Sequence, residues 1–259
     1  MTENIFGDYS AYYDLLYGDK QYAAESQYVA GVLSDIAPAV RTILEFGSGT
    51  GRHGRLLAGR GFEVTGVERS ETMVSIARRT GPPTTHGQTG SFQCIQGDIR
   101  TVDLGAYFDA VISLFHVVSY QTTNADLRQT FANAGHHLLP GGLFFFDVWH
   151  GPAVLGERPA VRVKRAENND IRLWRVAEPR IDLNASVVTV AYTILAESKQ
   201  THQLTTFDEE HHMRYLFPTD IDLLADQAGF RVVRSEEFLT RNPPSEQTWG
   251  VAYALRKEG

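Results

Sequence analysis

The chain is poor in cysteine, has no long apolar run and carries no excess of positive charge. Its 259 residues include one cysteine, Cys94, so an internal disulfide framework is excluded. Cys94 lies in a run of alternating apolar and polar residues, where we expect a small buried hydrophobic side chain. No stretch approaches the ~20 apolar residues of a membrane-spanning helix. Residues 1–9 also lack the apolar segment of a signal peptide. We therefore expect a globular cytoplasmic protein with no membrane partner.

Charge and ligand spacing exclude further classes of protein. Lysine and arginine number 24 against 31 aspartates and glutamates, a net charge of −7. A broad electrostatic contact with nucleic acid needs clustered positive charge, so we expect no nucleic-acid partner. His, Cys and Asp residues do not recur at metal-ligand spacing, and we expect no metal.

Changes of residue pattern divide the chain into four segments. Residues 1–40 form an aromatic-rich leader that ends in a helix. Residues 41–150 alternate short apolar strands with helices, which is typical of a parallel sheet covered on both faces. Residues 151–217 change to half-exposed strands separated by turn clusters, and predict an antiparallel β insertion. Residues 218–259 contain a helix and two strands that would complete the core sheet.

The most informative motif follows the first predicted strand, residues 43–46. Gly47, Gly49 and Gly51 stand at alternate positions before a predicted helix that begins at Arg52. Glycines let the backbone approach a ligand closely, and free N–H groups at a helix N-terminus would point toward it. The motif therefore predicts a ligand cradle at the carboxyl edge of the sheet.

Two kinds of ligand compete for this cradle. Residues 49–54 fit the G-x-G-x-x-G fingerprint, which would predict a dinucleotide-binding oxidoreductase. Glu45 would repel a pyrophosphate but could pair with the α-ammonium group of an amino acid. Asp98 could accept a hydrogen bond from an adenine amino group, and Glu68 could bind ribose hydroxyls under either interpretation. Since no residue pair suited to hydride transfer stands out, the pattern favours S-adenosylmethionine over a dinucleotide.

Four motifs then occur in order, LEFGSGTG at residues 44–51, GVE at 66–68, GDI at 97–99 and LPGG at 139–142. They resemble the successive motifs of the class I S-adenosylmethionine-dependent methyltransferases. The resemblance implies an α/β, Rossmann-like fold with a seven-stranded, mostly parallel sheet and an antiparallel β insertion. It also implies S-adenosylmethionine as cofactor and S-adenosylhomocysteine as product.

The same resemblance implies which residues contact the cofactor. Glu45 would hold the methionine ammonium group, Glu68 both ribose hydroxyls, and Asp98 the adenine. The remaining implied contacts are the backbone of Gly47 and Gly49 at the methionine, the backbone of Ile99 at the adenine, and Leu114 with Phe115 beside the sulfonium.

A narrower resemblance concerns the acceptor. The leader from Asp8 to Glu25, residues 115–120 and the aromatic Trp149 are similar to those of the N,N-dimethyltransferases that act on dTDP-linked amino sugars. In that family a leader tyrosine, here matched by Tyr9, and a histidine after the fourth strand lie near the sugar amine. The histidine position matches Tyr120 rather than His116. The resemblance implies N-methylation of a nucleotide-linked amino sugar, although glycine-type N-methyltransferases share a related leader.

Methyl transfer asks mainly for alignment of donor and acceptor, so few residues are indispensable. An amine needs only a weak proton acceptor nearby, whereas a hydroxyl needs a base. The catalytic candidates are His116, Tyr9, Tyr120 and His212. His116 follows the fourth strand at the ligand-binding edge. His211 and His212 occupy neighbouring, opposite-facing strand positions, so at most one of them can face the site.

Aromatic and basic residues are the candidates for substrate contact. We expect Tyr9, Tyr13 and Tyr17 to fold over the methyl donor as a lid, because π-faces favour cations. Tyr13 and Trp149 would contact the acceptor, and Arg165, with Arg162 and Lys164, could bind a diphosphate. Three alternatives stay open: an O-methyltransferase, a dinucleotide-binding oxidoreductase and a non-catalytic binding module. The β insertion could also carry a homodimer contact.

Overall fold

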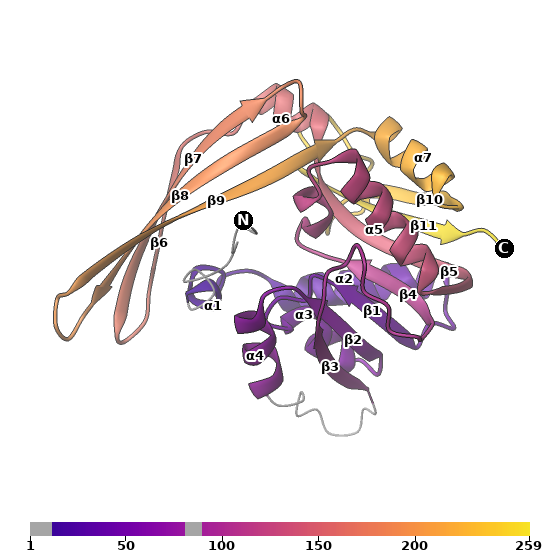
Figure 1. Ribbon diagram of the computed structural model, residues 1–259, viewed down its shortest axis with the longest axis horizontal. Coiled ribbons are helices and arrows are strands. Elements are labelled where there is room, and N and C mark those ends of the chain that lie inside the picture. Colours follow the sequence, from indigo (N-terminus) through magenta and orange to yellow (C-terminus); the bar gives the residue numbers. More distant parts are fainter. Residues whose placement is uncertain (1–11, 81–89) are drawn as a thin grey trace.

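The computed structural model describes residues 12–80 and 90–259 (Figure 1). Along the chain the elements are α1 (Tyr13–Leu16), α2 (Tyr22–Ile36), β1 (Thr42–Phe46), α3 (Arg52–Ala58), β2 (Glu63–Glu68), α4 (Glu71–Arg79), β3 (Ser91–Gln96), β4 (Phe108–Ser113), the 3-10 helix η2 (Val117–Tyr120), α5 (Asn124–His136), β5 (Leu138–His150), α6 (Gly151–Glu157), β6 (Arg162–Glu167), β7 (Ile171–Asp182), β8 (Val187–Ser198), β9 (Leu204–Leu216), α7 (Pro218–Gln227), β10 (Phe230–Glu237) and β11 (Gly250–Lys257).

The core sheet has the strand order β3-β2-β1-β4-β5, continued by β11 and β10. Strands β1 to β5 run parallel to one another, and β11 is antiparallel to both β5 and β10. This arrangement confirms the predicted Rossmann-like α/β class. Parallel strands place all their carboxyl ends at one edge, where the loops that follow β1 to β4 meet.

Apolar side chains cover both faces of this sheet. On one face Val29, Val32 and Leu33 of α2 pack with Leu57 of α3 against β1 and β4. On the other face α5 and α7 pack against β4 and β5, with Phe131 at the centre. The middle strands are buried on both faces, which explains why they contain few polar residues.

Strands β6 to β9 form an antiparallel meander that extends away from the core (Figure 1). Its ladder to the core consists of the parallel pairs Trp149–Tyr215 and His150–Leu216, between β5 and β9. Alternation along these strands turns one face inward, and there Leu173 and Ile194 pack around Leu16 of the leader. The predicted β insertion is confirmed by these four strands.

The structure departs from the sequence pattern at two places. Pro140-Gly141-Gly142 is a typical turn sequence, yet it lies within β5, which begins at Leu138 and shifts its register against β4 between Phe108 and Ala110. That irregularity accommodates the turn sequence within the strand. Helix α6, which starts with Gly151-Pro152, was not predicted, because seven residues carry too little periodicity. The division into four segments stays an interpretation. Among the described residues, no helix combines the length and apolarity that crossing a membrane requires.

Candidate active site

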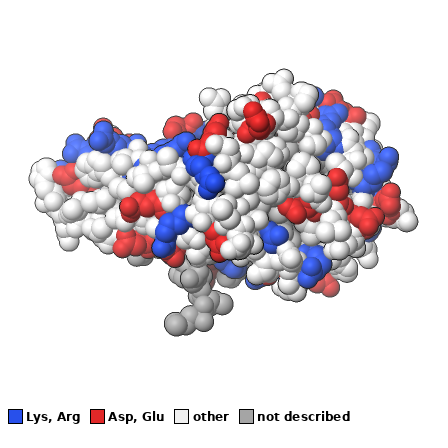
Figure 2. Space-filling view, turned by 90° about the horizontal axis from the view of Figure 1, so that it is seen from above, with Lys and Arg blue, Asp and Glu red and all other residues white. Residues whose placement is uncertain are grey.

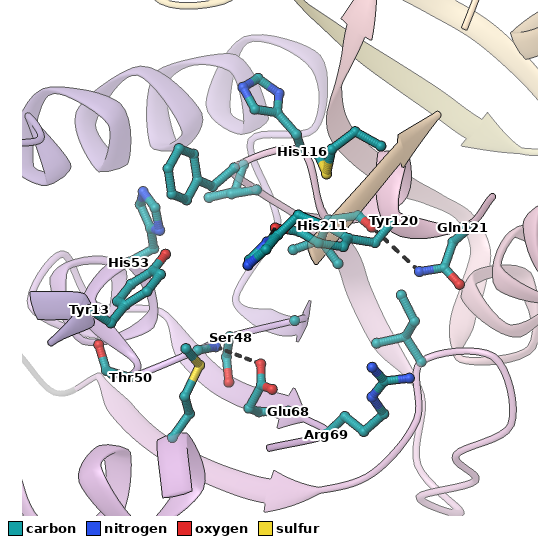
Figure 3. A pocket seen from close by; sticks show the side chains of 18 of the residues that line it. Tyr13, Ser48, Thr50, His53, Glu68, Arg69, His116, Tyr120, Gln121 and His211 are labelled. Carbon is teal, nitrogen blue, oxygen red and sulfur yellow. Dashed lines mark hydrogen bonds between the residues drawn. The ribbon is translucent and has the colours of Figure 1, made fainter. Parts of the chain in front are cut away.

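A cavity of about 550 Å³ lies at the carboxyl ends of β1 to β5. Its walls are the loops that follow these strands, the leader and the inner face of β8 and β9. Figure 3 shows Ser48 and Glu68 toward one end and His116, Tyr120 and His211 toward the other. The cavity therefore has two parts, which we call the cofactor half and the acceptor half.

The glycine loop forms the floor of the cofactor half. Gly47, Gly49 and Gly51 have φ values of 69°, 56° and 76°, a region that other residues rarely adopt. A Cβ on Gly47 would lie 2.5 Å from Cγ1 of Val117, so the loop also needs glycine for space. These residues bring bare backbone to the cavity wall.

Three N–H groups of the glycine loop are already engaged within the protein. The N–H groups of Gly47 and Ser48 donate to the Val67 carbonyl at 2.8 and 3.1 Å, and that of Gly49 donates to Glu68. A pyrophosphate would have to compete with these internal bonds. The cradle is therefore better suited to a ligand without a phosphate, and this weakens the dinucleotide interpretation.

Glu68 lies at the tip of β2, buried against the loop. Its Oε2 accepts from the Gly49 N–H at 3.0 Å (dashed in Figure 3), and its Oε1 accepts from the Ser70 N–H at 2.8 Å. Burial raises the pKa of Glu68, although these backbone hydrogen bonds oppose the shift. Two bonds fix the carboxylate in place, and its other lone pairs can still accept from a vicinal diol.

Glu45 stands behind the loop and is not among the residues that line the cavity. Burial raises its pKa to about 8, and its Oε2 has no hydrogen-bond partner among the described residues. A Cβ on Gly54 would lie 2.7 Å from this oxygen. Glu45 therefore does not reach the cavity surface, and its contact with the methionine ammonium group stays a prediction.

At the far end of the cofactor half, Asp98 and Ile99 line the wall after β3. Asp98 accepts from Nε and Nη2 of Arg100 at 2.9 and 2.5 Å, and Arg100 also contacts Asp126 at 2.6 Å. Pairing with Arg100 lowers the pKa of Asp98. The carboxylate thus lies where adenine was predicted, with part of its acceptor capacity committed to Arg100.

The loop after β4 joins the two halves. Leu114 is buried in the wall, and the next two residues, Phe115 and His116, have φ values of 65° and 61°. Such angles are strained for non-glycine residues, and strain of this kind often accompanies a functional site. Nδ1 of His116 lies 2.7 Å from Oδ2 of buried Asp147, so His116 borders the cavity but is anchored to β5.

Asp147 is a site residue that the sequence analysis missed. It is the one charged residue in the apolar run from Leu143 to Val148, and that exception was a usable signal. It also accepts the backbone N–H of His116 at 3.2 Å. Asp147 therefore maintains the strained turn.

His211, and not His212, faces the acceptor half beside Tyr120. Oη of Tyr120 lies 2.7 Å from Nδ1 of His211, and the His211 side chain is buried. His212 borders the cavity as well, but its Nδ1 lies 3.0 Å from Oγ1 of Thr189, its partner on the other face of the meander. Both histidines therefore border the cavity, and His211 is the one beside Tyr120. Trp149 also lines this wall, and its contact with the acceptor stays a prediction.

The leader closes the cavity from the meander side. Tyr13, Tyr17 and Tyr22 line it, and the Tyr17 ring meets Phe115 edge-on at 5.1 Å. Nη1 of Arg175 donates to the Tyr17 hydroxyl at 2.8 Å, which ties the leader to β7. Tyr9, the leader tyrosine named as catalytic, lies outside the described residues.

Arg165 does not face the cavity. It pairs with Trp174 in the β6–β7 register, while its neighbour Lys164 pairs with Arg175 on the inner face. The Arg165 side chain is exposed on the opposite face. Of the basic residues predicted to bind a diphosphate, Lys164 faces inward beside Arg175, whereas Arg165 faces away from the cavity.

A buried polar cluster ties the leader to α3. Oε2 of Glu25 lies 2.7 Å from Nε2 of His53 and also forms an ion pair with Lys20. Burial opposes ionisation of Glu25, but the hydrogen bonds from His53 and Lys20 outweigh it and lower its pKa. Nζ of Lys20 lies 4.4 Å from the Phe115 ring centroid, so the cluster supports the strained turn.

Potential metal ligands gather at one place within the described residues. Ligand atoms of Asp103, His136 and His137 lie within 4.8 Å of one another. However, Nδ1 of His137 lies 2.9 Å from the Asn133 carbonyl and its Nε2 accepts from the Leu104 N–H at 3.2 Å. Because both nitrogens are engaged, this group does not fit a metal ion, and none of the three lines the cavity.

Charged side chains of both signs are spread over the face shown in Figure 2. Basic and acidic residues are interspersed there, with broad uncharged areas between them. The cavity therefore indicates the ligand more specifically than the surface charge does.

Comparison with known proteins gives a consistent picture. Residues 43–142 match the model of a methyltransferase domain. The chain is 28% identical over 239 residues to a dTDP-3-amino-3,4,6-trideoxy-alpha-D-glucopyranose N,N-dimethyltransferase of Streptomyces venezuelae, covering 91% of this chain and 94% of the relative.

Solved structures share the fold. An S-adenosylmethionine-dependent methyltransferase from Clostridium acetobutylicum superposes with a TM-score of 0.78 at 18% identity, covering 96% of this chain and 97% of the other. An S-adenosylmethionine-bound amino pentose methyltransferase from Micromonospora echinaspora gives 0.74 at 24% identity, with 97% of each chain covered.

Proposed function

We propose that this chain, an S-adenosylmethionine-dependent methyltransferase, N-methylates an amino sugar carried on a nucleoside diphosphate. The observation that carries the proposal is the extent of the similarity. It covers 91% of this chain in the first relative and 97% in the amino pentose methyltransferase structure, and so extends well beyond residues 43–142 into the parts that build the acceptor half. A resemblance confined to residues 43–142 would support the cofactor alone.

The cofactor half fits S-adenosylmethionine by its own geometry. The bare backbone at Gly47 and Gly49 would border the methionine end, Glu68 would accept from the ribose hydroxyls, and the wall at Asp98 and Ile99 would hold the adenine. When bound, this cofactor supplies an electrophilic methyl group on a sulfonium. The protein aligns the acceptor nitrogen with that group and excludes water.

The acceptor half suits an amine. Tyr17, Phe115, Trp149 and Tyr192 surround it, and aromatic faces attract an ammonium group. Lys164 and Arg175 lie on the inner face of the meander, where a diphosphate could reach them. A hydroxyl acceptor would gain less from this aromatic wall.

The direct test incubates the purified chain with S-adenosylmethionine and a set of dTDP-linked 3-amino and 4-amino sugars. Mass spectrometry should show the gain of one or two methyl groups on an amino sugar and none on the matched sugar with a hydroxyl in place of the amine. Methylation of the hydroxyl analogue instead would replace the proposal by O-methylation.

Calorimetry with S-adenosylhomocysteine and with NADH addresses the remaining alternatives. We expect binding of the first and none of the second, and the reverse would favour the oxidoreductase. Binding without turnover on any acceptor would favour a binding module. Two finer proposals, a cytoplasmic location and a homodimer contact on the meander, are tested by cell fractionation and by light scattering.

A further inference from the structure

We infer that Tyr120, His211 and Glu209 form a proton relay that removes the proton from the acceptor ammonium group. The inference rests on the proposed function and adds to it a route for the proton. Tyr120 comes from η2 and the other two residues from β9, so the relay joins the core to the meander across 91 positions of sequence.

The three side chains are linked by two consecutive hydrogen bonds. Oη of Tyr120 is 2.7 Å from Nδ1 of His211, and Nε2 of His211 is 3.2 Å from Oε2 of Glu209. The Tyr192 ring meets the imidazole edge-on, with centroids 4.8 Å apart, which fixes its orientation. Tyr120 and His211 border the cavity and Glu209 does not, so Glu209 is a positioning residue (Figure 3).

The order of donors follows from the chemistry of these groups. The Glu209 carboxylate accepts only, so Nε2 of a neutral His211 carries the proton and Nδ1 is the acceptor. The Tyr120 hydroxyl then donates to Nδ1, and a phenol oxygen in this role can accept a further hydrogen bond from the cavity. Burial raises the pKa of Tyr120 well above its usual range, so it passes a proton on without resting as a phenolate.

The proton step balances within the relay. An alkyl ammonium has no lone pair, so its nitrogen must lose a proton before it can attack. One N–H proton moves to Oη of Tyr120 while the Tyr120 proton moves to Nδ1 of His211. The amine is then neutral, Tyr120 is unchanged and His211 is an imidazolium paired with Glu209. The imidazolium later releases its proton to water, and a methylated ammonium can be deprotonated in the same way.

Other charged or titratable groups face the relay. They are Tyr17 of the leader, Arg175 of β7 and Tyr192 of β8. Arg175, 4.6 Å from the Tyr192 ring centroid, disfavours a second cation nearby. Glu209 offsets that repulsion, which is a physical reason for a carboxylate behind His211.

The pH dependence of kcat tests the relay with Tyr120→Phe, His211→Gln and Glu209→Gln. At pH 6.5 we expect kcat to fall about tenfold or more in the first two variants and about threefold in the third, less than full general acid–base catalysis contributes because an amine needs only a weak proton acceptor. Near pH 9 the amine is increasingly neutral in solution, so the deficit should shrink to about twofold. An equal loss at every pH would indicate a merely structural role and overturn the inference, as would an unchanged profile.

His202→Asn provides the matched control. His202 is an exposed histidine at the β8–β9 turn with φ of 56°, which asparagine tolerates, and its profile should match the parent enzyme. Thermal unfolding and S-adenosylhomocysteine affinity of all four variants should stay near the parent values.

A measurement on the ligand-free protein separates the two possible failures. Nitrogen-15 NMR of the His211 imidazole should show the Nε2–H tautomer, and the Nδ1–H tautomer would overturn the relay whatever the acceptor. Absence of methyl transfer to every amino sugar, with S-adenosylhomocysteine still bound, would overturn the proposed function and with it the relay's substrate.

Discussion

The two halves of the cavity are built in different ways. The cofactor half consists of loops that follow successive strands, and much of its surface is backbone. The acceptor half consists of side chains from the leader, η2 and the inner face of the meander, which meet only after the sheet has formed. The first half depends on local chain geometry, whereas the second depends on strand register and on which face each residue occupies.

The largest predicted effect is the loss of S-adenosylhomocysteine affinity when the glycine loop of the cofactor half is changed. We expect Gly47→Ala to weaken S-adenosylhomocysteine binding about 100-fold, roughly 2.7 kcal/mol, because its Cβ would meet Val117 at 2.5 Å. Gly61→Ala is the control, since Gly61 also has a positive φ, 97°, but no atom within 4 Å of an added Cβ. Calorimetry should show full affinity for the control. Equal losses would assign the effect to backbone strain alone.

The next effect concerns a single side chain of the cofactor half. Glu68→Ala removes the carboxylate proposed to accept from the ribose and should weaken S-adenosylhomocysteine binding at least about tenfold, or ~1.4 kcal/mol. Glu63→Ala, at the opposite and exposed end of β2, is the matched control. Unaltered affinity of the Glu68 variant would contradict the ribose assignment.

The third prediction concerns how the stability of the folded chain depends on pH through Glu45, which is buried behind the cofactor half. Burial raises the pKa of Glu45 to about 8, so the folded chain keeps a proton that the unfolded chain loses above its ordinary pKa near 4.5. Stability from this group is therefore present below about pH 4.5 and is lost as pH rises toward 8.

Glu45→Gln, which cannot ionise, should be more stable than the parent by about 1 kcal/mol at pH 8 and equal to it near pH 5. The expected gain is modest because the new amide also needs partners. Thermal melts of the ligand-free proteins measure it. A difference that did not change with pH would contradict a protonated Glu45.

The smallest predicted effect lies in the acceptor half. Arg175→Met removes the hydrogen bond to Tyr17 and the contact with Tyr192, so we expect the acceptor KM to rise about threefold with kcat nearly unchanged. S-adenosylhomocysteine affinity should stay constant. A larger loss of cofactor binding than of acceptor binding would show that the two halves are not separable at this residue.

Sequence predicted the core fold and the position of the cofactor half well. Glycines at alternate positions and acidic residues at strand ends are local signals, and parallel strands bring their carboxyl ends together without further information. The engaged N–H groups of Gly47 to Gly49 were not predictable, because their acceptors lie on β2.

The acceptor half was harder to predict because one strand position decides which side of the sheet a residue faces. That is why His211, and not its neighbour His212, lies beside Tyr120, and why Arg165 faces away while Lys164 faces in. Asp147 was missed for another reason. Its partner His116 lies 31 positions away, and nothing in the sequence of either residue indicates the strained turn that joins them.

The two-pair ladder between β5 and β9 has a consequence for how such an enzyme can diversify. An arm with so small a hydrogen-bonded seam to the central sheet can change its exposed residues, or even its length, while the seven core strands keep their order. Changes in the arm could then alter which acceptor is bound, while the residues that bind the methyl donor stay unchanged.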